Sequence, residues 1–218
     1  KRTRPLEIIG PPGIEEHTQH GCEHFHFHTE VKRNYELTFR EYDPGTKLET
    51  CGFSILPLPA WHHPETRPHM LRVATESRAV FFSGDTGWTD ALPSQVGDVN
   101  LFICESTLFE EGFEYHISHE RMLRERDRFA CDQILLTHMG SLVLANLDRV
   151  QFDTATDGEL IYVSLLEVDG RTIPAPNVGT PRPITPGQMV VATYDFSGAQ
   201  KWLVKPGEFI SAHGYCAS

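Results

Sequence analysis

Two residues with metal-binding side chains follow apolar segments that lie far apart in the sequence. Asp85 lies in the turn Ser83–Thr86, directly after the apolar segment Ala79–Phe82, and His138 follows the apolar segment Gln133–Leu136. Short, nearly continuous apolar runs predict strands that are buried on both faces of a sheet. A carboxylate and an imidazole at one sheet edge are ligand types of an open site for zinc, iron or manganese. Each residue alone is typical of a turn aspartate or a capping histidine, and only their combination favours a metal site.

A further ligand could come from the segment Trp61–Thr66, which contains the adjacent residues His62 and His63. One of these imidazoles could point into the same site as Asp85. The alternative is an ordinary loop histidine.

The elements that must position these residues predict an α/β domain. A third apolar run, Leu101–Cys104, ends at Glu105, and helices are expected over Ser118–Ala130 and Ser141–Val150. Strands that alternate with helices favour an α/β sheet whose chemistry lies at the strand ends. Further strands are expected at Leu6–Ile9, Tyr35–Phe39 and Gly52–Leu58, with a hairpin that joins Leu71–Val73 to Ala79–Phe82.

The composition changes after this pattern ends, near Val163. We therefore predict an α/β domain over residues 1–166 and a tail over residues 167–218. Closely spaced prolines between Pro174 and Pro186 predict an extended linker, and Gln188–Phe196 with Lys201–Val204 suit a hairpin.

Length and charge limit the classes of function. The 218 residues suffice for one domain, and a formal charge of −11 opposes broad binding to phosphate backbones. No run of about 18 apolar residues is present, so no membrane span is expected. Five cysteines without a Cys-x-x-Cys pair disfavour a disulfide scaffold and favour a cytoplasmic protein.

A cluster of histidines, His24, His26 and His28, alternates with Phe25 and Phe27. This period of two predicts a strand with its phenylalanines inward and its histidines in solvent. Adventitious metal binding and a substitute catalytic site are the alternatives. Gly21 is expected to separate this strand from a short helical turn before it.

Four segments together resemble the metallo-β-lactamase superfamily, in particular its ribonuclease Z and small-phosphodiesterase branch. They are Arg4–Gly13, His62–Arg72, Ser83–Thr89 and Leu136–Gly140. The resemblance implies an αββα metallo-β-lactamase fold, of which this chain would hold a C-terminal portion with an extra Pro-rich and β tail. The superfamily's His-x-His-x-Asp-His block is absent from the sequence, and in relatives it precedes the segment that matches Arg4–Gly13.

The resemblance also implies roles for individual residues. His62, with His63 as the alternative, would bind the first of two metal ions, Asp85 would bridge both, and His138 would bind the second. The ions would be zinc, with manganese or iron as alternatives. Glu105 and His116 match a pair that assists proton transfer at the leaving group, and a carboxylate that orients an imidazole suits that chemistry.

Two hypotheses follow for the function. In the first, the complete domain is a hydrolase in which metal-activated water attacks a phosphodiester, either a small cyclic or nucleotide diester or an RNA 3′ end. The acidic charge favours a small diester. In the second, the chain is a degenerate, non-catalytic module that binds or assembles. Its exposed sheet edge would then need a cover, and a second copy could supply it as a homo-oligomer.

Overall fold

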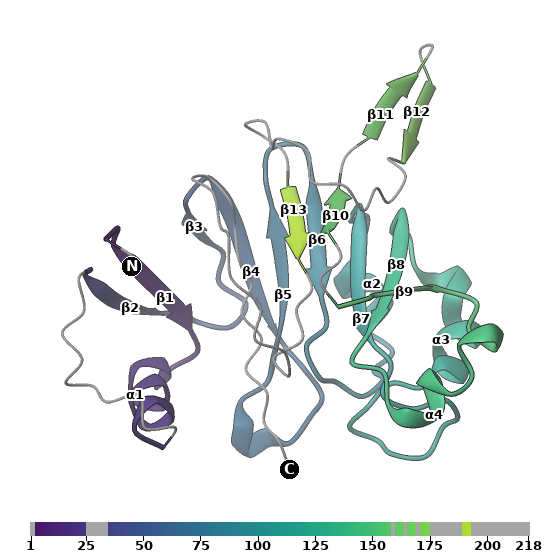
Figure 1. Ribbon diagram of the computed structural model, residues 1–218, viewed down its shortest axis with the longest axis horizontal. Coiled ribbons are helices and arrows are strands. Elements are labelled where there is room, and N and C mark those ends of the chain that lie inside the picture. The colour runs from purple at the N-terminus through teal and green to yellow at the C-terminus, as the bar shows by residue number, and fades with distance from the viewer. Residues whose placement is uncertain are drawn as a thin grey trace.

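The computed structural model describes residues 3–24, 35–157, 160–163, 165–168, 171–174 and 189–192 (Figure 1). The strands are β1 (Leu6–Gly10), β2 (Leu37–Glu41), β3 (Leu48–Thr50), β4 (Phe53–Pro59), β5 (His69–Ala74), β6 (Ala79–Phe82), β7 (Leu101–Glu105), β8 (Gln133–Thr137), β9 (Asp153–Thr154), β10 (Leu160–Val163), β11 (Leu165–Val168), β12 (Arg171–Pro174) and β13 (Met189–Ala192). The helices are α1 (Ile14–His24), α2 (Leu92–Val96), α3 (His119–Glu125) and α4 (Ser141–Leu144), with 3-10 turns at Pro64–Thr66, Arg126–Arg128 and Leu147–Arg149.

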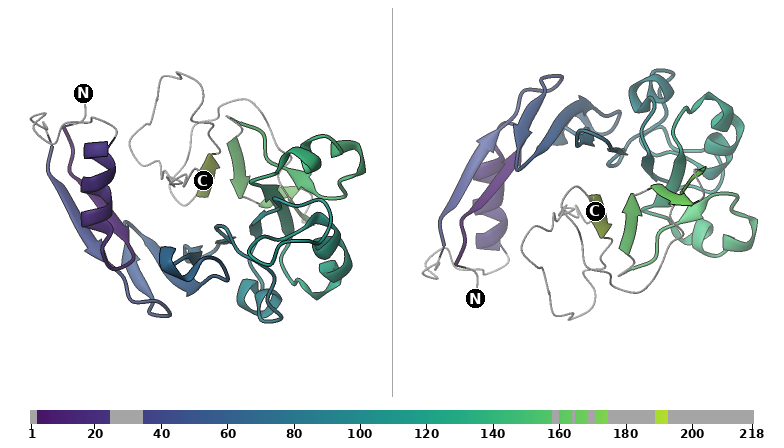
Figure 2. Two further views of the ribbon diagram at one scale, coloured as in Figure 1. Left: turned by 90° about the horizontal axis from the view of Figure 1, so that it is seen from below. Right: turned by 90° about the horizontal axis from the view of Figure 1, so that it is seen from above.

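The main sheet has seven strands in the order β3-β4-β5-β6-β7-β8-β9. Its first half, from β3 to β6, is antiparallel, and its second half, from β6 to β9, is parallel. A parallel pair, β1 and β2, forms a small separate sheet beside β3 and carries α1 (Figures 1 and 2). The predicted α/β class is confirmed.

Alternating side chains of the central strands fill two cores, one on each face of the sheet. On one face Phe81, Phe102 and Leu136 pack with Leu92 of α2 and Met122 of α3. The opposite face carries a second cluster, formed by Val80, Leu101, Ile103, Leu135 and Ile161 of β10. All five residues of β7 are buried: the burial of Leu101–Cys104 was predicted from their apolar run, and Glu105 is buried as well. The central parallel strands are thus packed against side chains on both faces of the sheet.

Both predicted helices after β7 are shorter than expected. Ser118 caps α3 through its Oγ, which accepts from the Arg121 N–H, but the helix ends at Glu125. Beyond it, Phe129 is extended and packs on Phe102, with ring centroids 5.3 Å apart. Helix α4 is a single turn, and the Asn146 side chain donates a hydrogen bond to the Leu142 carbonyl at its C-terminal end.

The histidine-rich segment differs from its prediction. Helix α1 runs without a break through Gly21 to His24, so Gly21 does not separate a turn from a strand. One glycine costs a helix only about 1 kcal/mol, which is insufficient to end it. His24 therefore belongs to a helix, while Phe25–His28 lie outside the described residues.

In the predicted tail, β11 pairs with β12, and β13 pairs with β10 of the preceding segment. The hairpin partner expected at Lys201–Val204 and the linker beyond Pro174 lie outside the described residues. The division at residue 166 falls within β11 and stays a prediction. In the described part of the chain, no helix has the length and apolar character needed to cross a bilayer.

Phe102 lies at the centre of the core on one face of the sheet and provides a test of this packing. It is fully buried and contacts Phe81 edge to face at a centroid distance of 5.7 Å. We expect Phe102→Ala to lower the free energy of unfolding by about 3–5 kcal/mol in urea denaturation. Leu142→Ala is the control, because Leu142 is 67% exposed and its loss should change stability by less than about 0.5 kcal/mol. A small effect of Phe102→Ala would contradict the packing.

Candidate functional site

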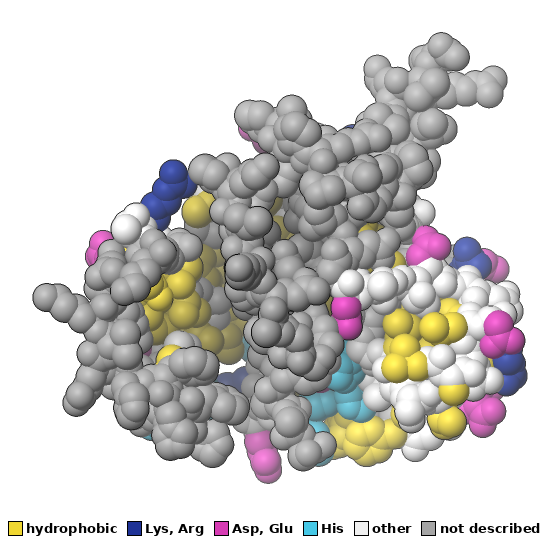
Figure 3. Space-filling view, viewed as in Figure 1, with side chains coloured by type: hydrophobic (Ala, Val, Ile, Leu, Met, Phe, Trp, Pro, Cys, Tyr) yellow, Lys and Arg dark blue, Asp and Glu magenta, His cyan; other side chains and the backbone are white. Residues whose placement is uncertain are grey.

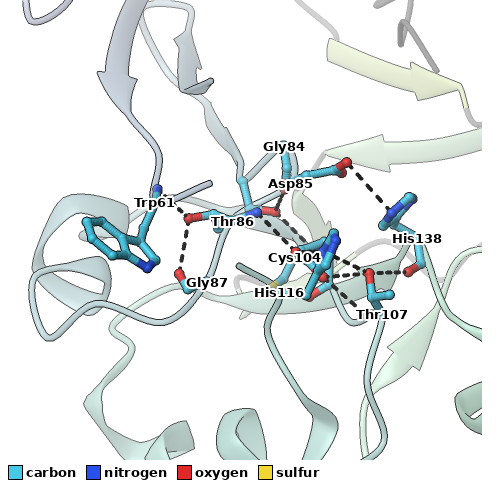
Figure 4. A network of polar contacts seen from close by, with 11 residues as sticks. Trp61, Gly84, Asp85, Thr86, Gly87, Cys104, Thr107, His116 and His138 are labelled. Carbon is cyan, nitrogen blue, oxygen red and sulfur yellow. Dashed lines mark hydrogen bonds and ion pairs between the residues drawn. The ribbon is translucent and has the colours of Figure 1, made fainter. Parts of the chain in front are cut away.

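The ends of three parallel strands bring the candidate residues to one edge of the sheet (Figure 4). In register, Phe82 of β6 pairs with Ile103 of β7, and Glu105 of β7 pairs with Thr137 of β8. Asp85, Glu105 and His138 follow or end these strands. The register therefore brings Asp85 to the same edge as His138, which lies more than fifty positions later in the sequence.

Glu105 is the buried centre of this edge, with only 1% of its side chain exposed. Its Oε1 accepts from the Thr86 N–H at 3.0 Å, and its Oε2 accepts from the Thr107 N–H at 3.0 Å and the Thr107 hydroxyl at 2.9 Å. Its own N–H donates to Ser83 Oγ at 2.9 Å. A buried carboxylate is stable only when it is satisfied in this way, and here it joins the loop after β6 to the loop after β7.

His116 is the ion-pair partner of Glu105. Its Nδ1 lies 2.7 Å from Glu105 Oε1, the distance of a charge-assisted hydrogen bond. This bond raises the pKa of His116 above its ordinary value, against the opposite effect of partial burial. Because Nδ1 donates to the carboxylate, Nε2 is the nitrogen left to exchange a proton with a substrate.

Thr107 connects this pair to His138. Its hydroxyl lies 3.1 Å from the His138 carbonyl and 3.2 Å from His116 Nδ1, in addition to its contact with Glu105. Gly140 keeps this approach open, because a Cβ there would lie 2.3 Å from the Thr107 carbonyl oxygen. A side chain at position 140 would push the Thr107 backbone away from the network.

The side chains of Asp85 and His138 lie close to each other at the solvent-exposed side of the site. Asp85 Oδ2 lies 3.7 Å from His138 Nε2, and the two side chains are 47% and 36% exposed. His138 has a φ of 49°, in the left-handed region that disfavours residues with a Cβ. Strained backbone of this kind occurs often at functional sites, and here it lies at the predicted metal ligand.

Of the two adjacent histidines, His62 lies nearer to the network. Its ring contacts that of His116 with centroids 5.1 Å apart, whereas His63 packs on Tyr115 at 4.5 Å. Burial and the neighbouring His116 lower the pKa of His62, and Asp85 opposes this effect. The structure thus gathers the rings of His62, His116 and His138, and Figure 3 shows histidine side chains in one patch beside hydrophobic ones.

The described residues match part of the metal site that the resemblance implies. Asp85 and His138 form a pair with the right donor atoms. However, no group of three His, Cys, Asp or Glu side chains in the described ranges stands close enough to hold an ion. A structural or catalytic zinc needs at least three protein ligands, so this pair is not a complete site.

Sequence reasoning missed the residues that support Glu105. Thr86 and Thr107 were not singled out, although Thr86 directly follows Asp85 and Thr107 lies two positions after Glu105. Their position beside Asp85 and Glu105 was the available signal. Gly87 was missed as well, and a Cβ there would lie 1.7 Å from the Glu114 carbonyl oxygen, so the loop after Asp85 requires glycine.

The raised pKa of His116 predicts a pH-dependent contribution to stability. Because the folded pKa exceeds the unfolded value, about 6.5, this stability is fully present below that pH. It is lost as the pH rises through the folded pKa. We expect His116→Gln to destabilise the chain more at pH 5.5 than at pH 9 in urea denaturation. An equal loss of stability at both pH values would show that the ion pair does not form, and His17→Gln, on exposed α1, is the control.

Comparisons with known proteins agree with this fold. A family profile described as the beta-lactamase superfamily domain matches residues 1–139. A search of curated protein sequences gave no significant match.

Several solved structures are similar. The metallo-beta-lactamase fold protein YhfI from Bacillus subtilis has 18% identity and a TM-score of 0.54, with 69% of this chain and 61% of YhfI covered. Zn(2+)-bound PqqB from Methylobacterium extorquens has 12% identity and a TM-score of 0.53, with 71% and 61% covered. A diphosphatase from the PhnP family has 12% identity and a TM-score of 0.51, with 71% and 57% covered.

At these identities the structures show a common fold. The chain spans about 61% of the length of YhfI and of PqqB. With its family profile matched over residues 1–139 and its sheet shared with these structures, the chain belongs to the beta-lactamase superfamily and has the metallo-beta-lactamase fold.

Proposed function

We propose that this chain carries the acid–base part of a metal-dependent hydrolase that cleaves phosphodiesters, within the ribonuclease Z and small-phosphodiesterase branch. The observation that supports it best is the buried Glu105–His116 pair beside Asp85 and His138. A buried Glu–His ion pair can also have a purely structural role, so the Glu105–His116 pair alone would not indicate catalysis. Its position beside Asp85 and His138, at the ends of parallel strands, favours a catalytic role.

His116 is suited to protonate a leaving group. Glu105 accepts from Nδ1, fixes the orientation of the ring and favours its protonated form. In the described part of the chain no hydrogen bond reaches Nε2, so this atom can donate a proton to a departing alkoxide. General acid catalysis of this kind contributes roughly 10²–10⁴-fold to a rate.

His62 would be a ligand of the first of two zinc ions, His138 of the second and Asp85 of both, with manganese or iron as alternatives. Two ions are expected in a complete site, whose remaining donors must come from outside the described residues. When bound, zinc lowers the pKa of water and polarises a phosphoryl oxygen. The 47% exposure of Asp85 leaves its carboxylate accessible to an ion.

The charge of the chain favours a small diester over an RNA 3′ end. At −11, its field repels an extended phosphate backbone, whereas a small diester brings only one negative charge. The neighbour from the PhnP family is described as a diphosphatase, but its likeness to this chain concerns the fold.

A second candidate is a non-catalytic module. It is favoured by one observation, that the described residues assemble two ligands where a zinc site needs three or more. In this case Asp85 and His138 would be a surface ion pair, and the fold would serve binding or assembly, including assembly with a second copy.

The first experiment measures hydrolysis of a 3′,5′-cyclic nucleotide, a small diester whose leaving group is an alkoxide, by the full chain with added zinc or manganese. We expect His116→Ala to lower kcat by about 10²–10⁴-fold, because the leaving group loses its proton donor. His17→Ala, on exposed α1, should leave kcat unchanged. Full activity of His116→Ala would rule out this role.

The second experiment measures metal content by elemental analysis after mild chelator dialysis. About two metal atoms per chain, lost in Asp85→Ala and His138→Ala, are expected for the hydrolase. Asp90→Ala is a matched control, because Asp90 is an exposed carboxylate paired with Arg128 away from the site. Near-zero metal in the unaltered chain would favour the non-catalytic module.

A further inference from the structure

A pocket of about 470 Å³ opens beside His116, and its lining includes Trp61, Trp88, Glu111, Phe113, His116 and Arg121. The volume lies within the range of sites for small molecules, about 300–1,000 Å³. His116 belongs both to this pocket and to the ion pair with Glu105. In Figure 4, Trp61 lies on one side of His116 and His138 on the other. Neither Asp85 nor His138 is among the residues that line the pocket.

The walls of this pocket present aromatic rings to solvent. Trp61 is 50% exposed and Phe113 is 48% exposed, although large aromatic side chains are usually buried. The Phe113 ring contacts that of His116 at a centroid distance of 5.9 Å and that of Tyr115 at 5.5 Å. Exposed aromatic side chains that gather around a hollow mark a binding surface.

The cations in the described lining are already paired. Arg121 lies over the Trp88 ring at 5.1 Å and forms ion pairs with Glu111 and Glu125, each at 3.6 Å. His116 is paired with Glu105. A phosphate group in this pocket would therefore have no unpaired cation to bind among the described lining residues. An uncharged aromatic ring, in contrast, could stack on the exposed aromatic side chains.

We propose that this pocket binds an uncharged, planar aromatic group on the leaving side of the substrate, of the chemical class of a nucleobase. This inference rests on the proposed function, because that function makes His116 the residue next to the leaving group. It narrows the substrate from any phosphodiester to one whose leaving group carries a base. Trp61 and Phe113 are then specificity residues that stack on the ring.

The test is isothermal titration calorimetry of adenosine into the full chain, which needs no turnover. We expect one site per chain, with a dissociation constant on the order of 1 mM or tighter. Trp61→Ala and Phe113→Ala should each weaken binding about fivefold or more, because each removes a stacking surface. D-ribose, which lacks the base, should give no binding heat.

Leu142→Ala is the matched control, since Leu142 is an exposed apolar side chain on α4 that is absent from the pocket lining. Both aromatic variants should fold, because the two side chains are half exposed and the hydrogen bonds of Trp61 to Thr86 and Gly87 use its backbone. Melting temperatures check this expectation.

Adenosine affinity that is unchanged in both aromatic variants, or ribose that binds as tightly as adenosine, would overturn the proposal. A chain that binds adenosine at this site but hydrolyses no diester would refute the proposed function and leave the pocket assignment standing. An active hydrolase with no affinity for adenosine would refute only the pocket assignment.

Discussion

The buried carboxylate of Glu105 is the interaction on which the rest of the candidate site depends. It ends β7 and receives hydrogen bonds from the loop after β6, from Thr107 and from His116. Because the carboxylate is buried, each donor that it loses exposes it to an uncompensated desolvation cost, so the loops are bound to a single arrangement. The same arrangement orients His116 and holds Thr107 against the His138 backbone. Glu105 therefore both stabilises the loops and positions the side chains of the candidate site.

Much of the sheet could be predicted because its strands carry simple patterns. The continuous apolar runs of β6, β7 and β8 indicate burial on both faces, and the positions of Asp85 and His138 follow from parallel register. Helix lengths could not be predicted in the same way. Whether α3 continues to Phe129 depends on where that ring meets Phe102, a tertiary contact without a local pattern.

The candidate site, like the fold, could be predicted only in part from the sequence. The strand-end residues Asp85 and His138 could be located from the sequence, while Glu105 and His116 were paired through resemblance to a family. Their 2.7 Å contact depends on how the loop between β7 and α3 returns to the sheet. The hydrogen bonds of Thr86 and Thr107 depend on loop packing as well, at close approaches that only Gly87 and Gly140 permit.

The left-handed backbone at His138 has a consequence for how this chain can change over time. An L-residue with a Cβ costs roughly 1–2 kcal/mol in this conformation, and glycine would adopt it without that penalty. Replacing His138 by glycine would relieve this strain, but it would also remove the imidazole and its contact with Asp85. At position 138 the demands of the backbone and of the candidate site therefore oppose each other, because the residue that fits the backbone best has no side chain to place at the strand end.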